Sequence, residues 1–186
     1  MVLGQRSFSR ECLTIHSSRR RFAARLNSGV RCHMDFAQVL SECQEPKVGL
    51  AVLDALTKLF ENDIQLLGLN VSEESAAAKI AQYLQPHFPG MHIDVEYNRM
   101  GDAPKKVAWS GKLEEVYPDI IVHSRDTETN ILAVELKKDS NRESKDKDIL
   151  KLLAYRGELG YKHALFMRLG VKAGAGDVSE CEWVGA

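Results

Sequence analysis

Three charged residues stand at the ends of two apolar segments in the middle of the chain. Asp119 comes directly before the segment 120–122, and Glu135 and Lys137 end the segment 131–137. In an extended strand residues i and i+2 point to the same face, so Glu135 and Lys137 should project together. If the two segments pair as neighbouring strands, Asp119 joins them. Two carboxylates and a lysine at one spot are typical of a site that handles a divalent metal and a phosphate.

Each residue of this group has an expected role. We expect Asp119 and Glu135 to bind the metal, with the main-chain carbonyl of Leu136 as a third ligand and Mg²⁺ or Mn²⁺ as the ion. Lys137 would orient or deprotonate the attacking water and offset the charge that builds on the phosphate oxygens. The alternative is a hairpin with charged ends, in which Glu135 and Lys137 form a solvated ion pair worth little. Pro118, which suits the first residue of a strand, favours the site.

Apolar periodicity predicts the elements that would position this group. The expected elements are a short helix at 35–40, helices at 46–62 and 72–85, a strand at 91–97, a polar loop or hairpin at 100–116, a strand hairpin at 120–123 and 131–134, a helix at 143–156 and a strand at 161–169. The segment 64–69 is ambiguous. The last strand follows a crossover helix and should lie parallel to its neighbour. The order predicts an α/β fold with a mixed central sheet flanked by helices.

Length and composition limit the class of protein. The chain has 186 residues, of which 44% are hydrophobic and 27% charged, as in a globular domain with its own core. Residues 1–33 carry seven arginines and one acid, so their charge of +6 leaves about −7 for the rest of a chain with net charge −1. A net-acidic body argues against nucleic-acid binding through bulk electrostatics. Any phosphate contact should therefore be local.

The chain divides into four expected regions. These are a flexible basic extension at 1–33, a helical segment at 34–70, a core at 71–172 and a Gly-rich, frayed tail at 173–186. The extension could also be an organelle-targeting peptide or a nucleic-acid-binding arm. The four cysteines have no metal-ligand or disulfide spacing and indicate reduced thiols. No run is long and apolar enough for a membrane span, so we expect a cytoplasmic protein without a membrane partner.

Several stretches of the chain resemble a known protein family. The Pro-Asp segment 118–123, the strand 131–137 and the Lys-rich helix after it resemble the PD-(D/E)xK nuclease superfamily, which has the restriction-endonuclease-like fold. Together with the segment 95–99, Val-Glu-Tyr-Asn-Arg, they look like small uncharacterised bacterial members of that superfamily. The resemblance covers about residues 72–170. It implies an αβββαβ core and an N-terminal helical extension outside it.

The resemblance also implies an activity and its residues. It implies Mg²⁺-dependent hydrolysis of phosphodiester bonds, with Asp119 and Glu135 as metal ligands and Lys137 as the catalytic lysine. A further acid commonly comes from the first core helix of the superfamily, which here points to Glu74, with Glu73 as the neighbouring alternative. Acids are favoured in the first turn of any helix by its dipole, so both could be purely structural.

Four further residues are candidates for contacts with nucleic acid. Arg99 could bind a phosphate with two hydrogen bonds, and Asn98 could bond a base or the backbone. Lys147 and Lys151, one helical turn apart, are candidates for phosphate contacts. An ion pair of Arg99 with a nearby carboxylate and a solvated lysine face explain the same residues equally well.

Three functions are consistent with these patterns. The first is a metal-dependent endonuclease, with DNA as the expected substrate. The second is a catalytically inactive nucleic-acid-binding or assembly module of the same fold. The third is an interaction protein that forms a homodimer through the helix 46–62, because this helix is apolar nearly all round and must be buried or meet a partner.

Overall fold

The computed structural model describes residues 43–125, 127 and 129–185 of the chain. The basic extension 1–33 and the helix expected at 35–40 lie outside these residues. The helices are α3 (Pro46–Asn62), α4 (Ile64–Gly68), α5 (Glu73–Leu84) and α6 (Asp146–Leu159), with 3₁₀ turns η1 (Gln85–His87) and η2 (Lys172–Gly174). The strands are β1 (His92–Val95), β2 (Arg99–Met100), β3 (Ala103–Pro104), β4 (Lys106–Val107), β5 (Glu114–Glu115), β6 (Ile120–His123), β7 (Asn130–Lys138), β8 (His163–Leu169) and β9 (Val178–Trp183).

The central sheet has five strands in the order β1-β6-β7-β8-β9. β6 pairs antiparallel with both β1 and β7, and Ile120 lies opposite Val134. β8 lies parallel to β7, as a crossover through α6 requires, and β9 closes the sheet antiparallel to β8. The prediction of an α/β protein with a mixed sheet is confirmed, as are the β6–β7 hairpin and the parallel β8.

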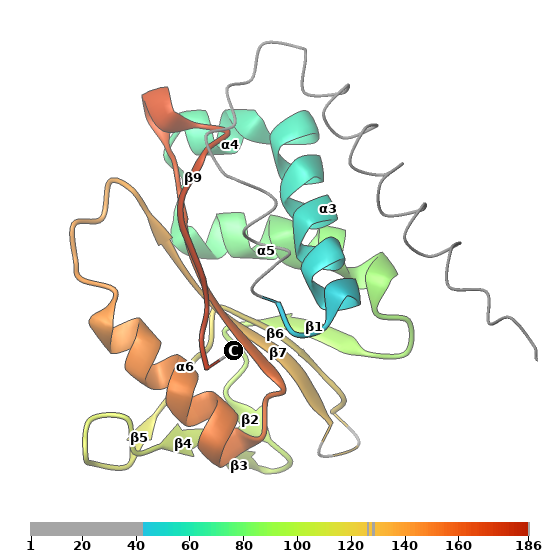
Figure 1. The fold of residues 1–186 in the computed structure, drawn as a ribbon, viewed down its shortest axis with the longest axis vertical. Coiled ribbons are helices and arrows are strands. Elements are labelled where there is room, and N and C mark those ends of the chain that lie inside the picture. Colours follow the sequence, from blue (N-terminus) through green and yellow to red (C-terminus); the bar gives the residue numbers. More distant parts are fainter. Residues whose placement is uncertain (1–42, 126, 128, 186) are drawn as a thin grey trace, which may run out of the picture. The chain divides into compact units, whose positions relative to one another are not determined.

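Helices cover both faces of the sheet (Figure 1). Val122 and Val134 point toward α3 and α5 and share a core with them, whereas Ile121 and Ala133 point to the other face and pack with α6. This alternation follows from the two-residue period of a strand. It also decides where the candidate residues lie, because Glu135 has the same parity as Ala133 and therefore faces α6.

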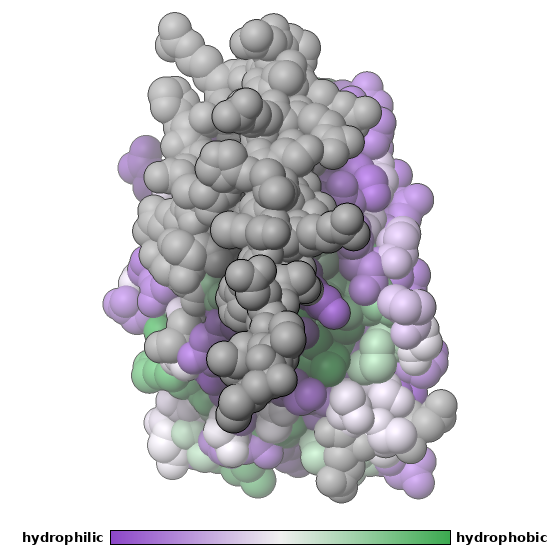
Figure 2. Space-filling view, turned by 45° about the vertical axis from the view of Figure 1, so that its right-hand side comes forward, coloured by the Kyte–Doolittle hydropathy of each residue, from purple (hydrophilic) through white to green (hydrophobic). Residues whose placement is uncertain are grey.

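Helix α3 buries its apolar residues within the chain. Pro46 occupies the first turn, where its missing N–H costs nothing, and Val52, Leu56 and Leu59 are buried in contact with the core that α5 completes. Of its large apolar side chains the only one that is substantially exposed is Leu50, at 41%. The expectation that this helix is largely buried is therefore confirmed. Leu50 is the one large apolar side chain that α3 could offer to a partner in a dimer through 46–62. Figure 2 shows that hydrophobic and hydrophilic residues mix where the described surface is visible.

The segment 100–116, predicted as a polar loop or hairpin, lies within two small antiparallel ladders. β2 pairs with β3 around Gly101, whose positive φ of 60° suits glycine, and β4 pairs with β5. Val107 and Val116 are buried against α6 on the outer face of the sheet. One lysine of this segment, Lys105, is buried as well, although lysine side chains are seldom fully buried.

The prediction of a frayed C-terminal tail at 173–186 is wrong. Val178–Trp183 forms the fifth strand of the sheet, and the Arg156 side chain donates a hydrogen bond to the carbonyl of Val184 at 2.7 Å. The glycines before the strand suggested a flexible end, but Gly170 and Gly174 belong to a tight connection: a Cβ on Gly170 would come within 2.1 Å of the Gly174 carbonyl oxygen. Within the part of the chain described here, no helix has the length and apolarity to cross a bilayer.

Candidate functional site

Asp119 directly precedes β6, and its side chain contacts the main chain of β7 at the end of the sheet. Its Oδ2 accepts a hydrogen bond from the main-chain N–H of Leu136 at 2.6 Å. The N–H and C=O of one strand residue point to the same edge, so the Leu136 carbonyl is turned toward Asp119 as well. The Leu136 side chain points to the opposite face and is buried in the core. The Asp119 carboxylate and the main chain of Leu136 are therefore in contact.

Glu135 lies near Asp119 and is almost completely buried, with 5% of its surface exposed. Its Oε1 accepts a hydrogen bond from the Tyr155 hydroxyl at 2.8 Å, and its Oε2 lies 3.6 Å from the Lys151 ammonium. Burial above all, together with the negative charge of Asp119, raises the pKa of Glu135 to about 8, against the opposing effects of Lys151 and Tyr155. The carboxyl group is thus held in place while its charge is only partly compensated.

The pKa of Asp119 is shifted in the same direction. Burial above all, together with the charges of Glu73 and Asp148, raises it to about 6, against the opposing effects of the hydrogen bond from Leu136 and the charge of Lys151. Burial and nearby acidic groups therefore disfavour the charged forms of both Asp119 and Glu135. A bound cation would remove this penalty for both groups.

Lys137 projects to the same face as Glu135 and forms two ion pairs. Its ammonium lies 3.1 Å from Asp148 Oδ2 and 3.6 Å from Glu143 Oε2. Burial acts to lower its pKa, but the hydrogen bond to Asp148 and the charges of Asp148, Glu73 and Glu143 outweigh it, so the pKa of Lys137 is raised. The lysine is therefore a cation at neutral pH. It suits the stabilisation of negative charge better than the removal of a proton from water.

Helix α6 supplies two residues that sequence reasoning missed, Asp148 and Tyr155. The helix predicted at 143–156 begins three residues later, at Asp146, and ends at Leu159, with Leu153 46% exposed. The inward stripe of α6 consists of the residues Asp148, Leu152, Tyr155 and Leu159. Their spacing of four, three and four residues is that of one helical face, so this spacing was the available signal. Asp148 positions Lys137, and Tyr155 positions Glu135.

Of the two acids at the start of α5, Glu73 and not Glu74 lies beside the group around Asp119. Ser72 caps α5 by accepting a hydrogen bond from the Ser75 N–H at 3.3 Å, and this register turns Glu73 toward the sheet. Glu73 Oε1 accepts the N–H of Lys138 at 2.9 Å, and its charge acts on the group around Asp119. Glu74 is exposed and forms a hydrogen bond with Ser72, which lowers the pKa of Glu74.

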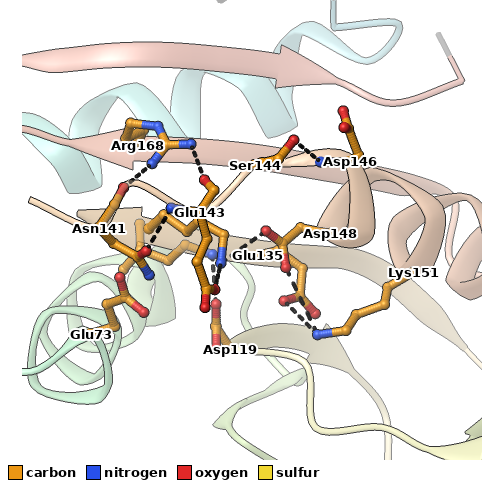
Figure 3. Close-up of polar contacts among 12 residues, drawn as sticks. Glu73, Asp119, Glu135, Asn141, Glu143, Ser144, Asp146, Asp148, Lys151 and Arg168 are labelled. Atoms are coloured by element: carbon orange, nitrogen blue, oxygen red, sulfur yellow. Dashed lines mark hydrogen bonds and ion pairs between the residues drawn. The ribbon is translucent and has the colours of Figure 1, made fainter. Parts of the chain in front are cut away.

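The loop between β7 and α6 is held over the site by Arg168 of β8. The Arg168 guanidinium donates to the carbonyl of Asn141 at 2.8 Å and to that of Glu143 at 3.3 Å, and it is paired with Glu180 at 2.6 Å. Figure 3 shows the Glu143 side chain pointing from this loop toward Asp119, with Glu135 and Asp148 on one side and Glu73 on the other. The site is thus built from α5, β6, β7, α6 and one anchored loop.

The predicted nucleic-acid contacts fall in different places. Lys151 belongs to the group, since it pairs with Glu135 and lies 3.8 Å from Asp148 Oδ1, whereas Lys147 is exposed on α6 outside it. Asn98 has a structural contact: its Oδ1 accepts the N–H of Lys105 at 3.1 Å. Arg99 lines a cavity at the opposite end of β6. The structure therefore brings neither Asn98 nor Arg99 to the carboxylates.

The donors around Asp119 fit a hard divalent ion in chemical type. Among the described residues no three His, Cys, Asp or Glu side chains are gathered in the way a metal-binding group requires. Asp119, Glu135 and the Leu136 carbonyl nevertheless offer the oxygen atoms that Mg²⁺ prefers, and Mg²⁺ commonly takes only one or two carboxylates and completes its shell with water. The raised pKa values show that the charged forms of both carboxyl groups are disfavoured, and a bound cation would favour them.

The chain was compared with known proteins at three levels. Neither protein-family models nor curated proteins nor solved structures give a match to it. What the protein does must therefore be inferred from the geometry of its own residues.

Proposed function

We propose that the protein is a divalent-metal-dependent nuclease that hydrolyses phosphodiester bonds in nucleic acid, with DNA as the expected substrate. The observation that carries this proposal is the pair Asp119 and Glu135, two carboxyl groups with raised pKa values beside a cationic lysine on one sheet face. The element order α5-β1-β6-β7-α6-β8 supports it, because it agrees with the αβββαβ core of the restriction-endonuclease-like fold once the small ladders β2–β5 are set aside.

In this proposal the metal is held by three oxygen donors. Asp119 and Glu135 supply carboxylates, and Leu136 supplies its carbonyl. A Mg²⁺ or Mn²⁺ ion bound there would polarise a phosphoryl oxygen and make its bound water more acidic. The Tyr155 hydroxyl keeps the Glu135 carboxylate in one orientation by donating to Oε1. Glu73 adds negative charge at the edge of the site through its position on the Lys138 N–H.

Lys137 has the role of a positioned cation. Its ammonium, held by Asp148 at 3.1 Å, would stabilise the negative charge that develops on the phosphate oxygens as the bond breaks. Glu143 at 3.6 Å lies on an exposed part of the loop and would give way to a phosphate more easily than the buried Asp148. Lys151 offsets part of the charge of Glu135 and Asp148 in the absence of substrate.

Cleavage of a supercoiled plasmid in 5–10 mM Mg²⁺ or Mn²⁺, concentrations on the order of those that fill weak sites, tests the proposal directly. Lys137→Met should lower the cleavage rate by roughly 10²- to 10³-fold, the effect of losing one preorganised charge-stabilising group. Lys58→Met is the matched control, because Lys58 is a partly exposed lysine of α3 that pairs with Asp54 and has no part in the group, and it should cleave like the wild type. Wild-type protein that leaves the plasmid intact with both metals, or a fully active Lys137→Met, would refute the nuclease.

A catalytically inactive module of the same fold is the second candidate. It is favoured by the burial of Glu135 and by the two carboxylates that already occupy Lys137. Thermal unfolding with Mn²⁺ separates the candidates, because a ligand that binds only the folded state raises its melting temperature. A Mn²⁺-dependent rise that Glu135→Gln abolishes, without plasmid cleavage, would identify the inactive module. If Mn²⁺ neither raises the melting temperature nor supports cleavage, the proposed metal site is refuted.

A further inference from the structure

A cavity of about 320 Å³ lies at the end of β6 opposite Asp119. At about 30 Å³ per water molecule it has room for roughly ten waters, and its size is at the lower end of the range for small-molecule sites. Its lining combines the β2–β3 ladder with the ends of β6 and β7, and it includes Tyr97, Arg99, Lys105, His123, Arg125 and Asn130. Among the described lining residues several are cationic and none is a carboxylate.

Lys105 is the most unusual residue of this lining. Only 2% of its surface is exposed, and its ammonium donates to the Tyr97 carbonyl at 2.9 Å and lies 4.7 Å from the centre of the Tyr97 ring. An ammonium has three N–H donors, and one carbonyl satisfies only one of them. No described carboxylate comes within 4 Å of this nitrogen. A buried charge in this situation is costly unless a further acceptor reaches it.

The nearest carboxylate, Asp94, is already engaged by other groups. Asp94 Oδ2 accepts hydrogen bonds from Arg125 Nε at 3.0 Å and contacts His123 Nε2 at 2.8 Å, and a second Arg125 nitrogen pairs with Oδ1. Its single negative charge therefore balances about one of the three cations Arg99, Lys105 and Arg125. Among the described lining residues, Arg99 and Lys105 are cations that do not pair with Asp94, and burial lowers the pKa of His123.

We propose that this cavity binds the phosphate monoester group of an organic ligand, with Lys105 and Arg99 as its principal contacts. A phosphate monoester carries nearly two negative charges at pH 7, which suit the cations Lys105 and Arg99, and its three terminal oxygens supply acceptors for the N–H groups of Lys105. The volume exceeds that of a phosphate ion and leaves room for the organic part, for which Tyr97 and Met100 provide apolar surface. A nucleoside 5′-monophosphate and the 5′-phosphorylated end of a nucleic-acid strand share this chemistry. Phosphate binding in this cavity does not require a metal at Asp119 and Glu135.

Calorimetric titration of the full-length protein at pH 7 in EDTA tests this site. The ligands are inorganic phosphate, AMP, adenosine and one oligonucleotide with either a 5′-phosphate or a 5′-hydroxyl. We expect each phosphorylated ligand to bind about tenfold or more tightly than its unphosphorylated partner, as charge-assisted hydrogen bonds predict. AMP and the phosphorylated oligonucleotide binding equally would assign the site to free nucleotides, and tighter binding of the oligonucleotide would assign it to strand ends. Equal binding with and without the phosphate would overturn the proposal.

Variants connect the binding to the named residues. Arg99→Gln changes an exposed residue of β2, so its fold should persist, and it should weaken binding of AMP about tenfold. Lys105→Met should weaken it by at least as much. Lys106→Gln is the matched control, because Lys106 is the next residue, exposed and paired with Glu115, and it should bind like the wild type. Glu135→Gln should also bind AMP normally, which separates this site from the nuclease proposal. An Arg99→Gln variant with wild-type affinity would refute the assignment.

Discussion

The two ends of β6 differ in the sign of the charge that the fold buries there. At the end that begins with Asp119, burial raises the pKa of Asp119 to about 6 and that of Glu135 to about 8. At the end where His123 lies, burial lowers the pKa of Lys105 to about 8. One physical cause, the poor solvation of charge in the interior, acts at both ends and shifts acids and bases in opposite directions. A ligand of opposite charge would stabilise each end.

The two ends also differ in how tightly their polar groups are arranged. Around the carboxylates nearly every group has a protein partner, as Leu136 donates to Asp119 and Tyr155 to Glu135. Around Lys105 one carbonyl serves a buried ammonium beside a cavity of about 320 Å³. A compact arrangement suits a small ion, whereas a roomy one suits a larger ligand. The comparison predicts that the ends respond differently to pH and to substitution.

The largest effect is expected from Glu135→Gln in protein kept free of metal. The pKa of Glu135 is 4.5 in an unfolded chain and about 8 in the folded one, so the folded protein binds a proton that the unfolded one has released between these values. Wild-type stability should therefore fall as pH rises from 4.5 to 8, and the variant lacks this term. The free energy of unfolding of Glu135→Gln relative to the wild type should rise by roughly 2 to 4 kcal/mol over this range. Urea unfolding at pH 5 and pH 8 measures it, and parallel curves would contradict the comparison.

Lys105→Met should show the opposite dependence on pH. The pKa of Lys105 is 10.5 in an unfolded chain and about 8 in the folded one, so between these values the unfolded chain binds more protons. Wild-type stability relative to Lys105→Met should rise by roughly 2 kcal/mol from pH 8 to pH 10.5, and the variant should be the more stable protein at pH 7. Urea unfolding of both proteins at pH 7 and pH 10 measures the difference. Lys106→Met, at an exposed position, should follow the wild type; if Lys105→Met does so too, the two ends do not differ as described.

The smallest effect is expected from Tyr155→Phe, which removes one hydrogen bond to Glu135. At pH 8 the loss of the hydroxyl should cost about 1 kcal/mol of stability, and less at pH 5, where Glu135 is protonated. Tyr161→Phe is the matched control, because the Tyr161 hydroxyl is buried and has no hydrogen-bond partner among the described residues. Urea unfolding of both variants at the two pH values measures this. Equal costs for the two substitutions would show that the Tyr155 bond adds nothing.

Local patterns in the sequence were enough to predict the central hairpin and its charged ends. The apolar runs of β6 and β7 are long enough to define strands, and the two-residue period then puts Glu135 and Lys137 on one face. The parallel position of β8 follows from the helix between the strands. These features depend on residues close together in the chain, where spacing alone carries the information.

Features that depend on packing between distant segments were missed. Asp148 is buried because Lys137 of another element pairs with it, and nothing near it in the chain indicates this. The choice of Glu73 over Glu74 depends on where Ser72 begins the helix, a difference of one residue. Lys105 is buried because Asn98 and Tyr97 bind its main chain and side chain. The sequence around it reads as a solvated turn.

The shortness of β6 fixes a length within the molecule. The strand has four residues and is hydrogen-bonded on both sides, by β1 and β7, so it can neither stretch nor slide. At about 3.3 Å per residue, the main chain at Asp119 and at His123 stays roughly 13 Å apart. The distance between the two ends of β6 is therefore fixed, and any molecule that contacts both ends at once has to be at least about that long.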